Sequence, residues 1–368
     1  MRSKKLTLLI VLLILLLSQI PFACRRFRLR RLNTAIQQLQ SQRIQQPANG
    51  FNEYQGVVHV HSFLGGHSAG TFAEIIAAAQ ANQLQFVIMT EHTEKDFDTA
   101  AMTLQGVHGG VLFINGNEVS AENGDRTLVL PGEVSIAAYP EDFKNWDSAR
   151  INGVEVYNVY TNARRFNPVV AFFDVLWSKR SYPELMFALY LQRPDESLKK
   201  WDQALARARL TATGGNDAHA NIGVSLKDSA GKTLLGIQLD PYATSFRLVR
   251  LHVLIEQGKT LDAASLLDAV RAGHCFIGFD FLGDASGFVF EADGKIQGDE
   301  IALNASTRLR VRSPVPARIV ILKNGAVWID ESGIASKEAA ITERGVYRAE
   351  VYLFGNLPWI ISNPVYVR

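Results

Sequence analysis

Gly56-Val57-Val58-His59-Val60-His61 is a short apolar run that ends in two histidines one residue apart. Residues i and i+2 of a strand project to the same face, so the imidazoles of His59 and His61 can reach one point. At the carboxyl end of a strand in an α/β barrel, that point is where active sites lie. A lone H-x-H is a weak motif, because two solvated loop histidines would give the same pattern.

Further histidines and carboxylates follow later apolar runs of the chain. They are His67 in the turn-like segment 65–70, His92 after the run 86–90, Glu118 after 111–114, and Asp217 and His219 after 210–213. Five of the eight histidines thus come just after a predicted strand. The other three have no such neighbours, and we interpret them as structural or surface groups: His108, His252 and His274.

The residue types limit the metal and its chemistry. Imidazole and carboxylate ligands without thiolate suit zinc, manganese or iron. The two cysteines, Cys24 and Cys275, can build neither a disulfide framework nor a cysteine-rich zinc site. One carboxylate can bridge two ions that activate a shared water, and Glu118 is our candidate for this bridge. Isolated loop carboxylates are usually solvated, so the assignment depends on the histidines.

Strand and helix signals alternate over roughly 200 residues of the chain. Short apolar runs at 56–59, 86–90, 111–114, 127–130, 134–138, 154–157 and 210–213 predict strands. Thr71 and Glu74 have capping-box spacing before a helix, and further helices are expected near 183–191, 197–208 and 261–272. This alternation predicts an α/β domain with parallel strands, open or closed into a barrel.

After about residue 287 the helical periods stop, and short β-rich runs follow one another. They lie at 288–291, 307–311, 319–322, 326–329, 347–353 and 359–367, and Lys323-Asn324-Gly325 between two of them is a strong hairpin signal. The pattern predicts a small antiparallel β-sandwich. We therefore divide the chain into 1–24, a membrane anchor; 25–50, a basic and Gln-rich linker; 51–285, the α/β domain with the histidines and carboxylates; and 286–368, the sandwich.

An uncharged run from Leu6 to Ala23 is flanked by basic residues on both sides. Eighteen residues rise roughly 27 Å as a helix, which is close to the thickness of a bilayer core. A cleaved signal peptide is the rival interpretation, but residues 21–24 (PFAC) match a cleavage site poorly. The five arginines after the run favour a single-pass anchor, and the side of the membrane stays open.

The overall charge is nearly balanced, with 38 basic and 36 acidic residues in 368 and a formal net charge of +2. A balance of this kind gives no electrostatic reason to expect a nucleic acid partner. The partner that the sequence itself indicates is the membrane, through the N-terminal helix.

The segment 57–118, together with GVEVYN at 153–158 and GGNDAH at 214–219, resembles the PHP (polymerase and histidinol phosphatase) superfamily. The tail, with LPWIISNP at 357–364, resembles its CehA/McbA-type branch. The resemblance implies a distorted (β/α)7 barrel with up to three metal ions. It implies that His59, His61, Glu118 and Asp217 hold one ion, and that His67, His92 and His219 hold another.

The ion between these two is less complete in this sequence. Where the family has histidines, the matching positions here are Asp125 and Tyr139, and a neutral tyrosine is a poor ligand. Glu91 also stands where the family often has an aspartate.

The resemblance implies that residues 51–285 are a hydrolase domain, which cleaves a small-molecule ester or phosphoester with a metal-bound hydroxide. Phosphoesters are the leading substrate class, and Asp217 and Glu118 are the catalytic carboxylates. Hydrolysis of carboxylic esters or carbamates would use the same ligands. A membrane-tethered binding protein whose metal site has decayed is the alternative outside enzymes, and the substitution at Tyr139 motivates it.

Overall fold

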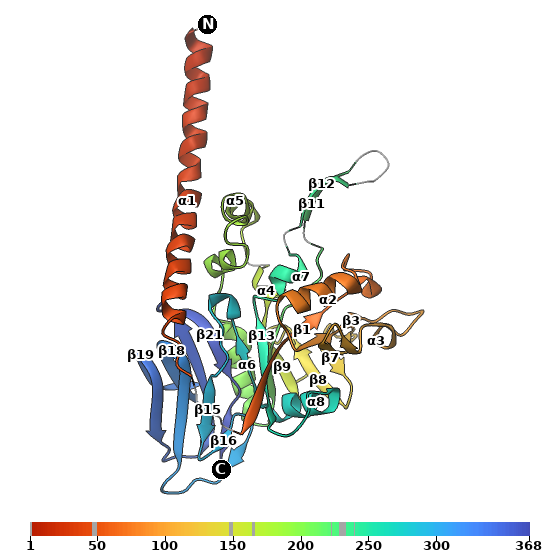
Figure 1. Cartoon of the computed structure of the whole chain (residues 1–368), viewed down its shortest axis with the longest axis vertical. Helices are drawn as coiled ribbons and strands as arrows, with labels where there is room; N and C mark the ends of the chain where they lie inside the picture. Colours follow the sequence, from red (N-terminus) through yellow and green to blue (C-terminus); the bar gives the residue numbers. More distant parts are fainter. Residues whose placement is uncertain are drawn as a thin grey trace.

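The computed structural model describes residues 2–45, 50–146, 150–163, 166–221, 223–227, 233–238 and 240–368. The protein is a mixed α/β molecule with one large sheet, one smaller sheet and a long N-terminal helix, α1 (Arg2–Gln40), which projects from the body as a single rod (Figure 1). The apolar run and most of the basic, Gln-rich linker are thus one continuous helix. The end of the linker, residues 46–49, lies outside the described residues.

The large sheet has the order β16-β15-β18-β20-β21-β14-β13-β1-β2-β5-β4, and β17, β19 and β22 pair off this path. Its strands are β1 (Phe51–Val60), β2 (Phe86–Met89), β4 (Gly106–His108), β5 (Val111–Ile114), β13 (Arg250–Glu256), β14 (Cys275–Gly278), β15 (Val289–Ala292), β16 (Lys295–Ile296), β17 (Glu300–Ile301), β18 (Arg308–Lys323), β19 (Ala326–Ala340), β20 (Gly345–Leu353), β21 (Leu357–Ser362) and β22 (Val365–Val367).

The smaller sheet has the order β10-β9-β8-β7-β6-β3. Its strands are β3 (Glu91–His92), β6 (Asn117–Ser120), β7 (Arg126–Leu130), β8 (Val134–Ala138), β9 (Gly153–Asn158) and β10 (Thr211–Gly215). A separate hairpin joins β11 (Gly223–Lys227) to β12 (Thr233–Gln238).

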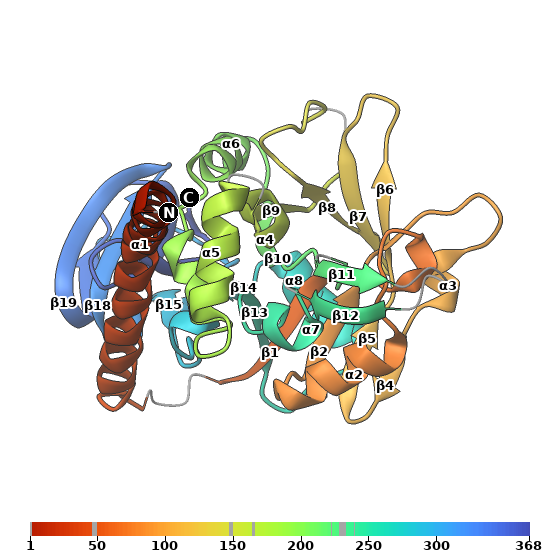
Figure 2. The ribbon, with the colours of Figure 1, turned by 90° about the horizontal axis from the view of Figure 1, so that it is seen from above.

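The helices after α1 are short. They are α2 (Phe72–Ala81), α3 (Thr99–Met102), α4 (Val159–Ala163), α5 (Pro168–Ser178), α6 (Asp195–Leu205), α7 (Tyr242–Ser245) and α8 (Ala263–Ala272), with 3-10 turns η1 (Phe63–Gly65), η2 (Leu185–Leu189) and η3 (Asp280–Leu282). The capping box that begins α2 is present, since Thr71 Oγ1 accepts from the Glu74 amide and Glu74 Oε2 accepts from the Thr71 amide. Figure 2 shows α2, α5, α6 and α7 from above.

The expectation of parallel strands is correct only in part. β1, β2 and β5 are parallel neighbours, as are β8, β9 and β10. Nearly all residues of these strands are buried except in the first half of β1, as expected for parallel strands covered on both faces. The pairs β6–β7, β7–β8 and β1–β13 are antiparallel instead. The helix expected near 183–191 is the 3-10 turn η2, and α5, β13 and β14 had no sequence prediction.

The C-terminal strands pair antiparallel except for β17 and β22, which are parallel. Asn324-Gly325 forms the predicted hairpin turn with positive φ at both residues (51° and 80°). The two runs at 307–311 and 319–322 are one long strand, β18. β14 pairs with β21, so the large sheet is continuous across the predicted boundary near residue 285. The closed barrel, the separate sandwich and the domain boundaries stay predictions.

One buried side chain, Asn363, connects the C-terminal segment by hydrogen bonds to β10, the strand that leads into GGNDAH at 214–219. Asn363 Oδ1 accepts from the Ala212 amide at 2.6 Å, and its Nδ2 donates to Ala212 O at 3.1 Å and to Cys275 O at 2.8 Å. Buried polar groups need partners of this kind, and here a single amide satisfies backbone groups of β10 and β14 together.

Candidate metal centre

The predicted ligands come from the ends of four strands. His59 lies in β1 beside a β-bulge that shifts the register with β2 between Val58 and Val60, and His61 follows the strand. His59 and Asp217 have left-handed backbones, with φ of 66° and 47°. Such conformations are strained for residues other than glycine and cluster at functional sites. The two histidines reach one point, but a bulge rather than simple strand alternation aims His59.

Glu118, on β6, faces three imidazoles with one oxygen. Its Oε2 lies 3.3 Å from His59 Nε2, 3.5 Å from His61 Nε2 and 3.4 Å from His92 Nδ1. The Glu118 side chain is 1% exposed. This single carboxylate oxygen can therefore balance positive charge located at any of the three imidazoles.

Asp217 repeats the arrangement from the loop after β10. Its Oδ1 lies 3.6 Å from His59 Nε2, 3.5 Å from His61 Nε2 and 3.3 Å from His219 Nδ1. Both carboxylates therefore face the same pair, His59 and His61.

These separations match those between ligands of one ion. Two atoms bound to a tetrahedral zinc ion at about 2.0–2.1 Å lie roughly 3.4 Å apart. Both ring nitrogens of His61 and Oδ1 of Asp217 are also buried without a hydrogen-bond partner. Orphaned buried polar atoms are costly, and a cation between them would satisfy them. The residues thus fit a divalent metal.

The electrostatics agree with this fit. Burial alone would raise the pKa of Glu118, but the hydrogen bond from His59 and the charge of His59 lower it to about 2. Burial also opposes a charged His59, yet Glu155 and Asp217 raise its pKa well above the usual value. Burial lowers the pKa of His61 to about 3, so that imidazole is neutral. The cluster holds excess negative charge beside a neutral imidazole, which favours a bound cation.

A second group of ligand atoms consists of His61, His92 and His219, which lie within 4.8 Å of one another. His219 Nε2 is 3.4 Å from His92 Nε2. His67 is exposed and is not in this group; its ring lies 5.0 Å from the His92 ring in an edge-on arrangement. All seven predicted residues converge, but His61 is closer than His67 to the second pair. Their roles as ligands stay a prediction.

Glu155 is a member of the site that the sequence analysis missed. Its buried Oε1 lies 2.7 Å from His59 Nδ1, and its Oε2 accepts from Asn158 Nδ2 at 3.0 Å. A carboxylate on the distal nitrogen fixes the tautomer and orientation of a ligand histidine. A charged residue inside the apolar strand GVEVYN was the available signal, because buried carboxylates require a partner.

Arg126 and Tyr139 line the other side of the cluster. Arg126 Nη1 donates to Glu118 Oε1 at 3.0 Å, and its guanidinium lies over the Tyr139 ring. Tyr139 Oη donates to Asp217 Oδ2 at 2.7 Å. Burial and the charges of Asp217 and Glu118 raise the pKa of Tyr139, so the phenol stays protonated. Tyr139 is therefore a hydrogen-bond donor to a ligand residue and is not itself placed as an anionic ligand.

Asp125 has a structural role that the sequence did not indicate. Its carboxylate accepts from the amides of Lys144 and Asn145 at 2.8 and 3.0 Å and from Asn123 Nδ2 at 2.8 Å. These bonds close the loop beyond β8. Burial would raise the pKa of Asp125, but the hydrogen bonds together lower it. Neither Asp125 nor Tyr139 belongs to the two ligand groups found among the described residues.

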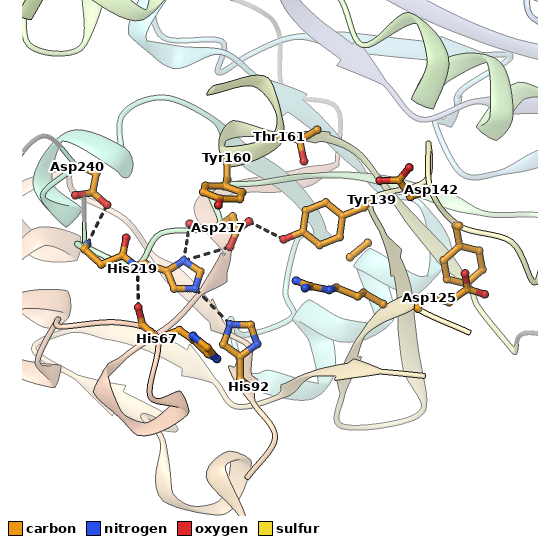
Figure 3. A pocket seen from close by; sticks show the side chains of 15 residues that line it. His67, His92, Asp125, Tyr139, Asp142, Tyr160, Thr161, Asp217, His219 and Asp240 are labelled. Atoms are coloured by element: carbon orange, nitrogen blue, oxygen red, sulfur yellow. Dashed lines mark hydrogen bonds and ion pairs between the residues drawn. The ribbon is translucent and has the colours of Figure 1, made fainter. Parts of the chain in front are cut away.

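The cluster opens into a cavity of about 510 Å³ that falls in the size range of ligand pockets. Figure 3 shows His219 between Asp217 and His92, with Tyr139 pointing toward Asp217 and Tyr160 and Thr161 of α4 at the rim. Among the described lining residues, Arg126 is the only lysine or arginine, beside four aspartates: Asp125, Asp142, Asp217 and Asp240.

The three histidines interpreted as structural or surface groups lie outside both ligand groups. His252 is buried between Glu53 (2.7 Å) and Asp280 (3.2 Å), His274 pairs with Asp299 at 2.9 Å, and His108 is exposed.

A search of protein-family models found no match, and a search of curated proteins found none either. Among solved structures, a two-domain protein from Bacteroides vulgatus, described as containing a predicted PHP-like metal-dependent phosphoesterase, aligns with 87% of this chain and 98% of that chain. The identity is 12% and the TM-score 0.38. A likeness this distant leaves the function to be inferred from the residues of this chain.

Proposed function

We propose that the protein is a metal-dependent hydrolase whose substrates are phosphoesters. His59, His61, Glu118 and Asp217 would hold one divalent ion, and His67, His92 and His219 would hold another. The hydrolase domain would span residues 51–285.

One observation carries the proposal: Glu118 Oε2 and Asp217 Oδ1 each face both His59 Nε2 and His61 Nε2, at separations of 3.3–3.6 Å. With His61 and Asp217 Oδ1 otherwise unpartnered, this arrangement of buried groups has no evident structural purpose without a cation.

Divalent ions held there would activate a water molecule and polarise the ester oxygen. The chain's own residues would orient the reactants. Glu118 and Asp217 would be the catalytic carboxylates, while Glu155 orients His59 and Tyr139 orients Asp217 through the hydrogen bonds given above. The Arg126 side chain, 45% exposed, can donate to a substrate oxygen from the cavity side.

The preference for phosphoesters rests on Arg126 and on the metal charge. Guanidinium groups bind phosphate oxygens well. Arg126 is the only lysine or arginine among the described residues that line the cavity, so the remaining positive charge for a phosphate would come from the metal. Carboxylic esters or carbamates would use the same ligand set, so a turnover assay has to decide between these substrate classes.

The test combines metal analysis with turnover. Purified full-length protein is expected to contain zinc, manganese or iron and to hydrolyse members of a panel of chromogenic phosphomonoesters and phosphodiesters. His59→Ala should lose metal and activity, whereas His108→Ala, at an exposed histidine, should lose neither.

Activity on carboxylic esters alone would refute the substrate class. Bound metal without turnover of any ester would refute the enzyme and leave the decayed binding protein.

We also propose that α1 is an uncleaved membrane anchor. An 18-residue window of this helix has a mean hydropathy of 2.6 and none of it is buried in the protein. A signal sequence near the N-terminus would pass the same test. Here, however, the helix continues to Gln40 and packs against the body, where Leu29 is 1% exposed. An N-terminal tag tests whether the segment is retained. The tagged protein should keep its full size in gel electrophoresis and stay with the membrane on carbonate extraction.

A further inference from the structure

Helix α5 lies beside α1, just where the apolar segment of α1 ends (Figures 1 and 2). Phe173 stacks on Phe22 with ring centres 4.8 Å apart, and Trp177 Nε1 donates to Gln19 Oε1 at 3.0 Å. These contacts cover the last turn of the uncharged run, so α5 sits at the level where a membrane-spanning α1 would leave the hydrocarbon.

An ion pair between Arg25, which is 25% exposed, and a buried carboxylate holds α5 at this level. Arg25 Nε and Nη2 bind Asp174, with separations of 2.6–3.0 Å, and the Asp174 side chain is fully buried. Tyr190 Oη also donates to Asp174. Breaking this pair leaves an uncompensated charge on the buried carboxylate, so the position of α5 along α1 is set strongly.

The opposite side of α5 is apolar and exposed. Val169, Phe172 and Leu176 follow one another at helical spacing and are 63%, 53% and 59% exposed. Asp174 is the only charged residue of the helix, and it faces α1. An apolar helix stripe of this size normally packs against the core or a partner.

Basic residues follow the apolar segments of both helices along the chain. Arg28, Arg30 and Arg31 of α1 are exposed, and Lys179 and Arg180 follow α5. An apolar stripe bordered by cations is typical of helices that lie in a membrane interface, with the cations among anionic headgroups.

The metal centre opens at the same end of the molecule. Asn158, which donates to Asp217 Oδ2 at 3.3 Å, is followed directly by α4, whose Tyr160 and Thr161 line the cavity. Figure 1 shows α4, α5 and α7 at the end of the body from which α1 projects. A membrane held by α1 and α5 would therefore face the cavity side of the protein.

We propose that α5 lies in the membrane interface as a second contact, and that the metal centre acts on phosphoester headgroups of membrane lipids. The second half rests on the hydrolase function proposed above. Anchor and stripe together would limit the tilt of the body, so that the cavity stays near the headgroups.

The position of α5 is tested with spin labels on the full chain in vesicles of phosphatidylcholine and phosphatidylglycerol. Cys24 is exposed and is replaced by serine, while the buried Cys275 is kept. Labels are placed by Phe172→Cys, by Leu12→Cys within the apolar run, and by Val107→Cys, a residue 69% exposed on β4. Collisions with oxygen should exceed those with a water-soluble nickel chelate several-fold more at 172 and 12 than at 107.

A label at 172 that behaves like the label at 107 overturns the proposal. So does a label at 172 shielded from both reagents, since that result means a protein partner or a second copy covers α5. Neither readout depends on catalysis.

The substrate is tested with a fluorogenic phosphodiester headgroup in the same vesicles and a soluble analogue of it. In the variant Val169→Ser/Phe172→Ser/Leu176→Ser, the rate of hydrolysis of the vesicle substrate should fall about tenfold, because the enzyme is no longer concentrated at the membrane. The rate on the soluble ester should not change. The matched control Val107→Ser/Val327→Ser, at exposed valines elsewhere, should change neither rate. Turnover of the soluble ester alone overturns the headgroup assignment, whereas no turnover of either ester refutes the hydrolase function and leaves the spin-label result standing.

Discussion

The hydrogen bond between Glu155 and His59 is the contact whose loss should reveal the metal centre most clearly. Both side chains are fully buried, and the Oε1–Nδ1 separation is 2.7 Å, the length of a charge-assisted bond. In Glu155→Gln the negative charge disappears, and the amide must also face Asn158 Nδ2, which now donates to Oε2. Partners that orient ligand histidines are worth about 10–100-fold in metal affinity, or roughly 1.4–2.7 kcal/mol.

The assay is a competition titration of the metal-free protein with zinc and a chromogenic chelator, followed by turnover with saturating metal. Glu155→Gln should bind zinc about 10–100-fold more weakly. Glu256→Gln removes a carboxylate that is 57% exposed at the end of β13 and should change nothing. If Glu155→Gln folds with unchanged zinc affinity, His59 is not a ligand and the proposed centre is wrong.

Three other perturbations test neighbouring features. Arg126→Gln should raise the KM for phosphoesters about tenfold or more while the metal content stays constant, because it removes a charged donor worth about 1.5–3 kcal/mol from the cavity; a change confined to metal content would contradict a role in substrate binding. Tyr139→Phe removes the donor to Asp217 and should lower the free energy of unfolding by about 1 kcal/mol without loss of metal; equilibrium denaturation beside metal analysis measures both, and loss of metal would mean that Tyr139 is a ligand after all. Burial opposes a charged His252, but Asp280 and Glu53 raise its pKa to about 10, above its unfolded value of about 6.5. The resulting stabilisation is full below about pH 6.5 and is lost as the pH rises through about 10, so His252→Gln should flatten the fall in stability over that window, and parallel curves for the two proteins would refute the pairing.

The sequence predicted the strands that surround the site because β-branched runs such as FVIM at 86–89 are buried on both faces and leave a clear signal. It also predicted that His59, His61, His92, Glu118, Asp217 and His219 come together, since each follows a strand. The sequence did not reveal which neighbouring strands run antiparallel. β13 pairs antiparallel with β1 across roughly two hundred residues, and no local pattern encodes that pairing.

The sequence analysis did not identify the residues that contact the proposed ligands rather than the metal. Glu155 is 96 residues from His59, and within GVEVYN it looks like an ordinary strand residue. Arg126 looks like a solvated surface residue until the fold places it beside Glu118. The apolar helix α5 gave no amphipathic signal because its exposed stripe is as apolar as its packed face.

Asn363 also bears on the order in which a newly made chain matures. Its bonds to Ala212 join residues that are 151 positions apart, and Ala212 belongs to the strand that leads to Asp217. At about 5–20 residues per second, the ribosome needs roughly 10–30 s to travel that distance. During this interval α1, the proposed membrane anchor, has long emerged, whereas β10 still lacks its bonds to Asn363. The strand that leads to the proposed ligand Asp217 is therefore completed well after the proposed anchor has been made.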